Sequence, residues 1–178
     1  MATFSKSEIQ NGLKRLGELA GQNDFSIQLI LVGGAAMVLG FDARQSTRDV
    51  DVVILSPEEA RLVRELARQV ADEYDWPEDW LNDGAKGYMV GLTKGPSLFR
   101  SPGIEATAPS LSQLLAMKLC AWRDDIDIAD ARRLLEEIGA GQKSADVWKE
   151  IEPYLVPGDE LTAQYAFMDL WESLYETD

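Results

Sequence analysis

The sequence predicts an α+β protein, in which a mixed sheet flanked by helices is followed by a C-terminal helical portion. Three observations indicate this class. Helix-period and strand-period apolar patterns alternate up to about residue 73. Short strand candidates broken by glycine and proline come next, and only helical patterns follow Ser110. We therefore expect an α/β core over residues 1–109 and a helical portion over residues 110–178 that packs on it.

The first half of the chain carries clear start and stop signals. Ser5 and Glu8 have the spacing of a capping box. The pair Gly33-Gly34 turns a strand into a helix, and Pro57 suits the first position of a further helix. The elements predicted here are a helix from Ser5 to about Gly21, a buried strand over 27–32, a short helix over 35–39, a strand over 49–55 and a helix from about 57 to 73.

In the second half of the chain, the sequence signals for strands are weak and those for helices are clearer. Residues 76–83 are expected to be irregular because two tryptophans bracket a Pro-Glu-Asp turn. Ser110 is expected to cap a helix. The strand candidates are 88–92, 97–100 and 103–107, and the helices are 111–123, 128–138, 145–154 and 161–175.

The amino-acid composition excludes several kinds of catalytic and metal-binding site. The chain has 178 residues, no histidine and the single cysteine Cys120. Histidine-dependent catalysis and histidine-ligated zinc are therefore excluded, and any metal must be held mainly by oxygen, which favours Mg²⁺. No apolar run approaches the length of a membrane helix, and the first ten residues lack a signal pattern, so we expect a cytoplasmic protein without a membrane partner.

The charge balance is strongly acidic. The formal net charge is −14, and nine acidic residues but only one basic residue, Lys149, lie between Ser144 and Asp178. Such a surface repels nucleic acid on average, and no DNA partner is expected. A local basic cleft remains compatible with this total.

Two carboxylates mark the strand over 49–55. Because side chains alternate along a strand, Asp49 and Asp51 project to one face, while Val50 and Val52 point into the core. Carboxylates at this spacing repel each other unless a cation lies between them, and Mg²⁺ commonly takes one or two carboxylates plus substrate phosphates. The alternative is a solvent-facing strand start without function.

The glycine pair adds a second feature. Gly33-Gly34 lies where a strand meets a helix N-terminus, and free N–H groups there suit a phosphate. Fourteen residues separate Gly34 from Asp49, and the glycine pair together with Asp49 and Asp51 resembles the nucleotidyltransferase superfamily fold. The lead-in Arg44–Arg48 resembles the bacterial toxin-like branch, the AbiEii-type families, whose members include nucleotidyltransferases of unknown function. Further similar segments are Trp80–Asp83, Leu114–Arg123 and Asp127–Asp130.

The resemblance implies roles for individual residues. It implies that Gly33 and Gly34 cradle the triphosphate, that Asp49 and Asp51 bind Mg²⁺ as catalytic carboxylates, and that Glu105 is the third one. It also implies that Lys118 contacts the nucleotide phosphates, although a lysine there could simply reach solvent. The other residues assigned to nucleotide binding are Arg44, Thr47, Arg48 and Arg123, with Asp127, Asp130, Asn82 and Asp83 in supporting places.

The expected reaction is Mg²⁺-dependent transfer of a nucleoside monophosphate from an NTP such as ATP to an RNA 3′ end, for example of tRNA, or to a protein hydroxyl. The resemblance suggests the toxin of a toxin–antitoxin pair, with a cognate partner. One alternative is an inactive fold member that acts as a regulatory or antitoxin-like binding partner. Another is a small-molecule transferase of the aminoglycoside-modifying type, which the acidic balance suits. An RNA acceptor requires a basic rim, for which the candidates are Arg44, Arg48, Lys86, Lys94, Arg100, Lys118 and Arg123.

Overall fold

The computed structural model describes residues 2–176, which form two compact units. The first comprises the chain up to Gly87 together with Lys94–Pro109. The second comprises Tyr88–Thr93 together with the chain from Ser110 onward. Within residues 2–176, no helix combines the length and the apolar character needed to cross a bilayer.

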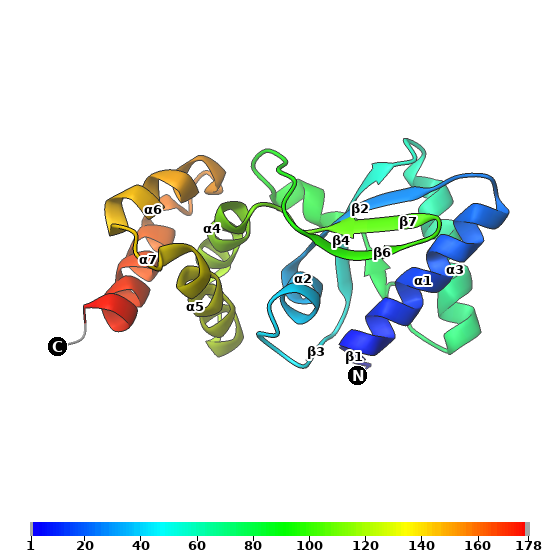
Figure 1. Ribbon diagram of the computed structural model, residues 1–178, viewed down its shortest axis with the longest axis horizontal. Helices are drawn as coiled ribbons and strands as arrows, with labels where there is room; N and C mark the ends of the chain where they lie inside the picture. The colour runs from blue at the N-terminus through cyan, green and yellow to red at the C-terminus, as the bar shows by residue number, and fades with distance from the viewer. Residues whose placement is uncertain (1, 177–178) are drawn as a thin grey trace. The chain divides into compact units, whose positions relative to one another are not determined.

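The first unit is built on a mixed five-stranded sheet with the strand order β5-β4-β2-β7-β6 (Figure 1). Strand β2 is central; it runs antiparallel to β4 and parallel to β7. Strand β5 pairs in parallel with β4, and β6 pairs antiparallel with β7. The strands are β2 (Ile27–Val32), β4 (Val50–Ser56), β5 (Leu81–Asn82), β6 (Ser97–Ser101) and β7 (Ile104–Thr107). A separate two-residue ladder joins β1 (Phe4–Ser5) to β3 (Ser46–Thr47).

Three α-helices accompany this sheet: α1 (Lys6–Gln22), α2 (Gly33–Gly40) and α3 (Ala60–Tyr74). Helix α1 packs on β6 and β7, α2 on β2 and β4, and α3 on β4 and β5. The capping box of α1 is formed, since the Ser5 hydroxyl accepts from the amide of Glu8 and the Glu8 carboxylate accepts from the amide of Ser5. A 3₁₀ segment, η1 (Gly84–Tyr88), follows β5. The predicted α+β class is confirmed.

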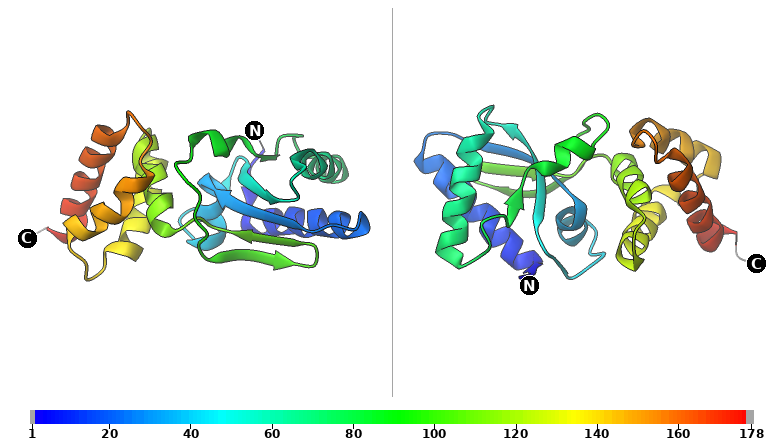
Figure 2. Two further views of the ribbon diagram at one scale, coloured as in Figure 1. Left: turned by 90° about the horizontal axis from the view of Figure 1, so that it is seen from above. Right: turned by 180° about the vertical axis from the view of Figure 1, so that it is seen from behind.

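The second unit is helical (Figure 2). Its elements are α4 (Leu111–Ala121), α5 (Asp125–Gly139), α6 (Ser144–Ile151), η2 (Glu152–Tyr154) and α7 (Glu160–Tyr175). Helix α4 packs on α5, α6 and α7, so it is the centre of this unit. The Ser110 hydroxyl caps α4 by accepting from the amide of Gln113, as its sequence position predicts.

Segment Tyr88–Thr93 belongs to the helical unit because one buried side chain of α4 binds it. Gln113 is fully buried, and its Oε1 accepts from the amide of Thr93 at 3.1 Å and from the Thr93 hydroxyl at 2.5 Å. Its Nε2 donates to the carbonyl oxygens of Val90 and Gly91, each at 3.1 Å. The backbone of this segment is therefore satisfied by a side chain, and the strand predicted over 88–92 does not form.

Several element boundaries differ from the predictions for identifiable reasons. Helix α3 begins at Ala60 rather than at Pro57, because Ser56 still pairs with Gln28 in the sheet. Helix α5 begins at Asp125, because the Asp124 carboxylate caps it. The segment predicted to be irregular over 76–83 contains the short strand β5, which exists only through its pairing with β4.

Candidate functional site

The turn from β2 into α2 is closely covered by side chains of the next segment. Gly33 has a φ of +59°, in the left-handed region. A methyl group on Gly33 would lie 2.9 Å from Oδ2 of Asp51. A methyl group on Gly34 would collide with the Thr47 hydroxyl and would lie 3.1 Å from Cζ of Arg44. Only glycines leave this corner, the start of a helix, open beside a carboxylate and a guanidinium.

Asp49 and Asp51 are both half-buried at the beginning of β4. Asp49 directly precedes the strand, and Asp51 lies opposite Val32, the last residue of β2. Burial, and then the charges of Asp51 and Asp79, raise the pKa of the Asp49 carboxyl, against the opposing influence of Arg48 and Arg44. Both burial and the neighbouring carboxylates therefore disfavour the ionised form of Asp49, and a bound cation would favour it.

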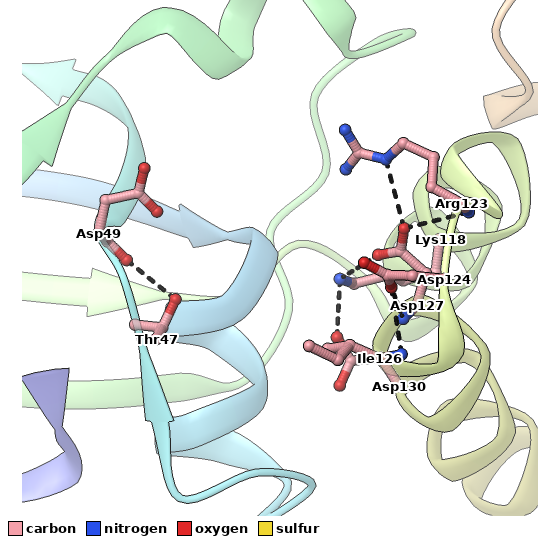
Figure 3. A network of polar contacts seen from close by, with 8 residues as sticks. All are labelled: Thr47, Asp49, Lys118, Arg123, Asp124, Ile126, Asp127 and Asp130. Atoms are coloured by element: carbon pink, nitrogen blue, oxygen red, sulfur yellow. Dashed lines mark hydrogen bonds and ion pairs between the residues drawn. The ribbon is translucent and has the colours of Figure 1, made fainter. Parts of the chain in front are cut away.

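Thr47 holds the loop before these aspartates. Its side chain is buried, and its hydroxyl donates to the backbone carbonyl of Asp49 at 3.2 Å (Figure 3). The residue also sits in β3, which pairs with β1 near the chain start. Thr47 therefore positions Asp49 and at the same time contacts the Gly34 corner.

Strand β5 places Asn82 next to Asp51. The two residues are register partners in the parallel β4–β5 pair, so their side chains lie on the same face of the sheet. The anchor is Trp80, which is buried and whose Nε1 donates to the carbonyl of Ala67 at 2.8 Å. The carbonyl of Trp80 accepts from the amide of Val50 at 2.7 Å. An amide oxygen is therefore available beside the aspartate pair.

Asp83 has a structural partner instead. Its carboxylate accepts three hydrogen bonds from the Arg64 guanidinium, one from Nη2 at 2.5 Å and two from Nε at 3.1 and 3.2 Å. The pKa of Asp83 is lowered mainly by this arginine. The predicted supporting pair Asn82-Asp83 therefore divides: Asn82 faces the aspartates and Asp83 ties β5 to α3.

The structure does not bring Glu105 to the aspartate pair. Glu105 lies opposite Gln28 of β2, whereas Asp51 lies opposite Val32. Four residues along a strand correspond to about 13 Å. Glu105 instead pairs with Arg100 across β6 and β7, at 3.4 Å. Among residues 2–176 no cluster of three acidic, histidine or cysteine side chains is arranged to hold a metal.

Asp79 is the acid near Asp49 that the sequence reasoning missed. It lies in the exposed turn before Trp80, and its charge contributes to the raised pKa of Asp49. The signal that could have found it is the tryptophan-bracketed turn itself, since Trp80 is buried and fixes the turn beside β4.

The helical unit contains a buried ionic cluster around Lys118. The ammonium nitrogen of Lys118 lies 2.7 Å from Oδ2 of Asp130 and 3.3 Å from Oδ1 of Asp127 (Figure 3). Arg123 donates to Oδ2 of Asp127 through its backbone amide at 3.3 Å and its Nε at 3.4 Å. The Asp124 cap accepts from the amide of Asp127 and so fixes the start of α5.

This cluster balances two carboxylates against two cations. Lys118, Asp127 and Asp130 are all buried, while the Arg123 side chain is 79% exposed. Burial alone would raise the pKa of Asp127, but Lys118 and Arg123 outweigh burial and lower it. Asp127 therefore contacts both Lys118 and Arg123, and Asp130 contacts Lys118.

A cavity of about 700 Å³ lies beside the loop that carries Arg44. Arg44 lines this cavity and also covers Gly34, so the cavity and the glycine corner share one cationic side chain. The lining comprises Ser5, Lys6, Ser7, Gln10, Val38, Asp42, Ala43, Arg44 and Gln45.

A mixed sheet with a glycine corner facing an aspartate pair defines a protein of the nucleotidyltransferase class. Residues 11–140 match the family described as nucleotidyltransferase of unknown function (DUF6036), and the chain belongs to this family. The family match spans most of the sheet unit and continues through α5. No curated protein matches the chain. The predicted resemblance to nucleotidyltransferases of unknown function is thereby confirmed.

Proposed function

We propose that this chain binds an NTP with Mg²⁺ at the Gly33-Gly34 corner and transfers the nucleoside monophosphate to a hydroxyl acceptor. The observation that carries this proposal is the contact of the corner with the carboxylate of Asp51 and the guanidinium of Arg44. A triphosphate at the start of α2 would meet backbone N–H groups, a cationic side chain and a carboxylate within a few ångströms. This is the arrangement that phosphoryl chemistry requires.

The donor set fits Mg²⁺. Asp49 and Asp51 supply two carboxylates, and Mg²⁺ completes its shell with water and phosphate oxygens, so a third carboxylate is not essential for binding. When bound, the ion supplies charge neutralisation of the phosphates and lowers the pKa of a coordinated hydroxyl. Asn82, beside Asp51, offers a further oxygen from the neighbouring strand.

The chain's own residues then have distinct tasks. The amides of Gly33 and Gly34 and the side chain of Arg44 hold the phosphates in place. One of the two aspartates accepts the proton of the attacking hydroxyl. The oxygen of the acceptor forms a bond with the α-phosphorus, the bond to the bridging oxygen breaks, and pyrophosphate leaves. Thr47, whose hydroxyl donates to the backbone carbonyl of Asp49, would hold Asp49 in place during this step.

For the acceptor, a protein hydroxyl is favoured over an RNA 3′ end. An RNA acceptor requires a continuous basic rim, but two of the candidate residues for that rim already have acidic partners. Arg100 pairs with Glu105, and Lys118 is buried in its ionic cluster. Arg44 and Arg48 remain beside the aspartates and suit the NTP itself. A role as the toxin of a toxin–antitoxin pair is compatible with either acceptor.

The test is nucleotide binding by calorimetry. Each common NTP is titrated with Mg²⁺ into the wild-type protein and into Asp49→Ala/Asp51→Ala. We expect Mg²⁺-dependent binding that weakens at least about tenfold in the double variant, a loss of roughly 1.4 kcal/mol. Glu105→Ala is the matched control, since Glu105 lies at the other end of β2, and it should bind as the wild type does. No binding by the wild type would refute the proposal.

A second candidate is nucleotide binding without turnover, in a regulatory partner protein. It is favoured by one observation: no third metal-binding carboxylate joins the aspartates among residues 2–176. The two candidates differ in pyrophosphate release. Mg²⁺-dependent NTP binding together with pyrophosphate production, in the presence of protein or RNA acceptors, supports transfer. Binding with no pyrophosphate from any acceptor supports the regulatory candidate.

A further inference from the structure

The helical unit has a groove between α6 and α7 that the proposed function does not use. Its volume is about 380 Å³. Aromatic rings form its floor: the centroids of Trp148 and Phe167 are 5.3 Å apart, and those of Phe167 and Trp171 are 5.7 Å apart. Rings packed in this way hold a fixed shape. The lining comprises Ser144, Ala145, Trp148, Phe167, Met168, Trp171, Glu172 and Glu176.

An exposed apolar stripe runs along α7 up to this groove. Leu161 and Tyr165 are each 63% exposed and Met168 is 48% exposed. Their spacing of four and three residues puts them on one face of the helix. Met168 belongs to both the stripe and the groove, so the two form one continuous apolar surface. Contiguous apolar surface of this kind marks an interaction site more often than scattered single residues do.

The charged side chains of α7 and of the groove lining are all acidic. Helix α7 carries Glu160, Asp169 and Glu172 and no lysine or arginine. The groove lining adds Glu176 and has no basic residue. Basic residues lie beside this surface rather than in it: Lys143 precedes Ser144 and Lys149 follows Trp148. Arg132 of α5 donates to the Ser173 hydroxyl of α7 at 2.9 Å. A nucleic acid, an anionic membrane or a second copy of α7 would therefore meet like charge here.

We infer that the surface formed by the α7 stripe and the α6–α7 groove docks a cationic amphipathic helix of a partner protein. The apolar side chains of that helix, repeating every three or four residues, contact Tyr165 and Met168 and enter the aromatic groove. Its lysines or arginines face Glu172 and Glu176. This inference does not depend on nucleotide transfer by the first unit.

The test uses synthetic peptides of about fourteen residues, roughly four helical turns. One peptide carries leucine on one face and lysine on the other, and its twin carries glutamate in place of lysine. Fluorescence anisotropy of labelled peptide measures binding to the full chain. We expect the lysine peptide to bind at least about tenfold more tightly than the glutamate peptide. We expect Tyr165→Ser/Met168→Ser to weaken binding of the lysine peptide about tenfold as well.

Two controls make the result specific. Tyr74→Ser removes a comparably exposed aromatic residue, 40% exposed, from α3 in the other unit and should leave peptide binding unchanged. Circular dichroism should show the fold of every variant intact, since the substituted side chains are exposed. The inference is overturned if both peptides bind equally, or if Tyr74→Ser and the double variant lose the same affinity. It is also overturned if sedimentation shows that the wild-type chain dimerises and the double variant does not, because a second copy then covers the surface.

Discussion

At the scale of single residues, the glycine corner leaves no space for a side chain. Gly34 has no room for a methyl group because the Thr47 hydroxyl occupies that space. We expect Gly34→Ala to lower the free energy of unfolding in urea by about 1–3 kcal/mol through overpacking and to weaken NTP binding. The matched control is Gly21→Ala in α1, where nothing lies within 4 Å of a new methyl group. Gly21→Ala should be neutral or slightly stabilising. Equal stability of the two variants would contradict the steric account.

The carboxylate of Asp127 gives the second residue-scale prediction, a dependence of stability on pH. Its pKa in the folded protein lies below the ordinary value of 3.8. The stabilisation is therefore complete above about that pH and is lost as the pH falls through the folded pKa. We expect Asp127→Asn to cost about 1–3 kcal/mol at neutral pH, because it removes charge-assisted hydrogen bonds in a buried cluster. The unfolding free energy of the variant should then fall less steeply with acid.

Asp125→Asn is the control for this experiment. Asp125 lies in the same first turn of α5 but is exposed. It should change stability at neutral pH by no more than about 0.5 kcal/mol. If Asp127→Asn behaves like Asp125→Asn in urea unfolding at pH values from neutral to acid, the buried cluster does not contribute to stability.

The candidate site could be predicted only in part from the sequence. The glycine pair and the aspartate pair are local signals, since each depends on residues one or two positions apart. The position of Glu105 relative to the aspartates depends on the register of the sheet. Register is fixed by pairing between strands that are far apart in the chain. Asp79 was missed for the same reason, because its place beside Asp49 follows from the parallel pairing of β4 with β5.

At the scale of elements, too, features set by neighbouring residues could be predicted, whereas features set by pairing between distant segments could not. Helices with side-chain caps, such as α1 after Ser5 and α4 after Ser110, could be predicted closely because the cap is local. The start of α3 could not, since Ser56 remains in the sheet through Gln28. Strand β5 has two residues and no pattern of its own, so its existence rests on tertiary pairing.

Gln113 provides the element-scale prediction. Its four hydrogen bonds hold segment Tyr88–Thr93 on α4, and its side chain is fully buried. We expect Gln113→Ala to destabilise the protein by at least about 2 kcal/mol, because buried groups lose their partners. The amide of Thr93, which donates to Gln113, should lose its protection in hydrogen exchange. Gln164→Ala, at an exposed position of α7, is the control and should leave that amide protected.

At the scale of the whole molecule, the charge of −14 sets the conditions under which a substrate arrives. An NTP is itself anionic and is repelled by the average surface. Arg44 and Arg48 are the cations whose influence reaches Asp49. For the proposed function, this charge would favour an NTP already neutralised by Mg²⁺ and a basic protein acceptor over a nucleic acid.

The hydrogen bonds between Gln113 and Thr93 also affect how the helical unit could be exchanged between related proteins. Part of the helical unit is encoded before β6 and β7, twenty positions upstream of the glutamine that secures it. A chimaera joined at residue 110 would carry the helices of one parent and the 88–93 segment of the other. The helical unit can therefore be exchanged only between relatives whose 88–93 segments match. Otherwise the exchange, whether by engineering or in evolution, requires a second crossover upstream of this segment.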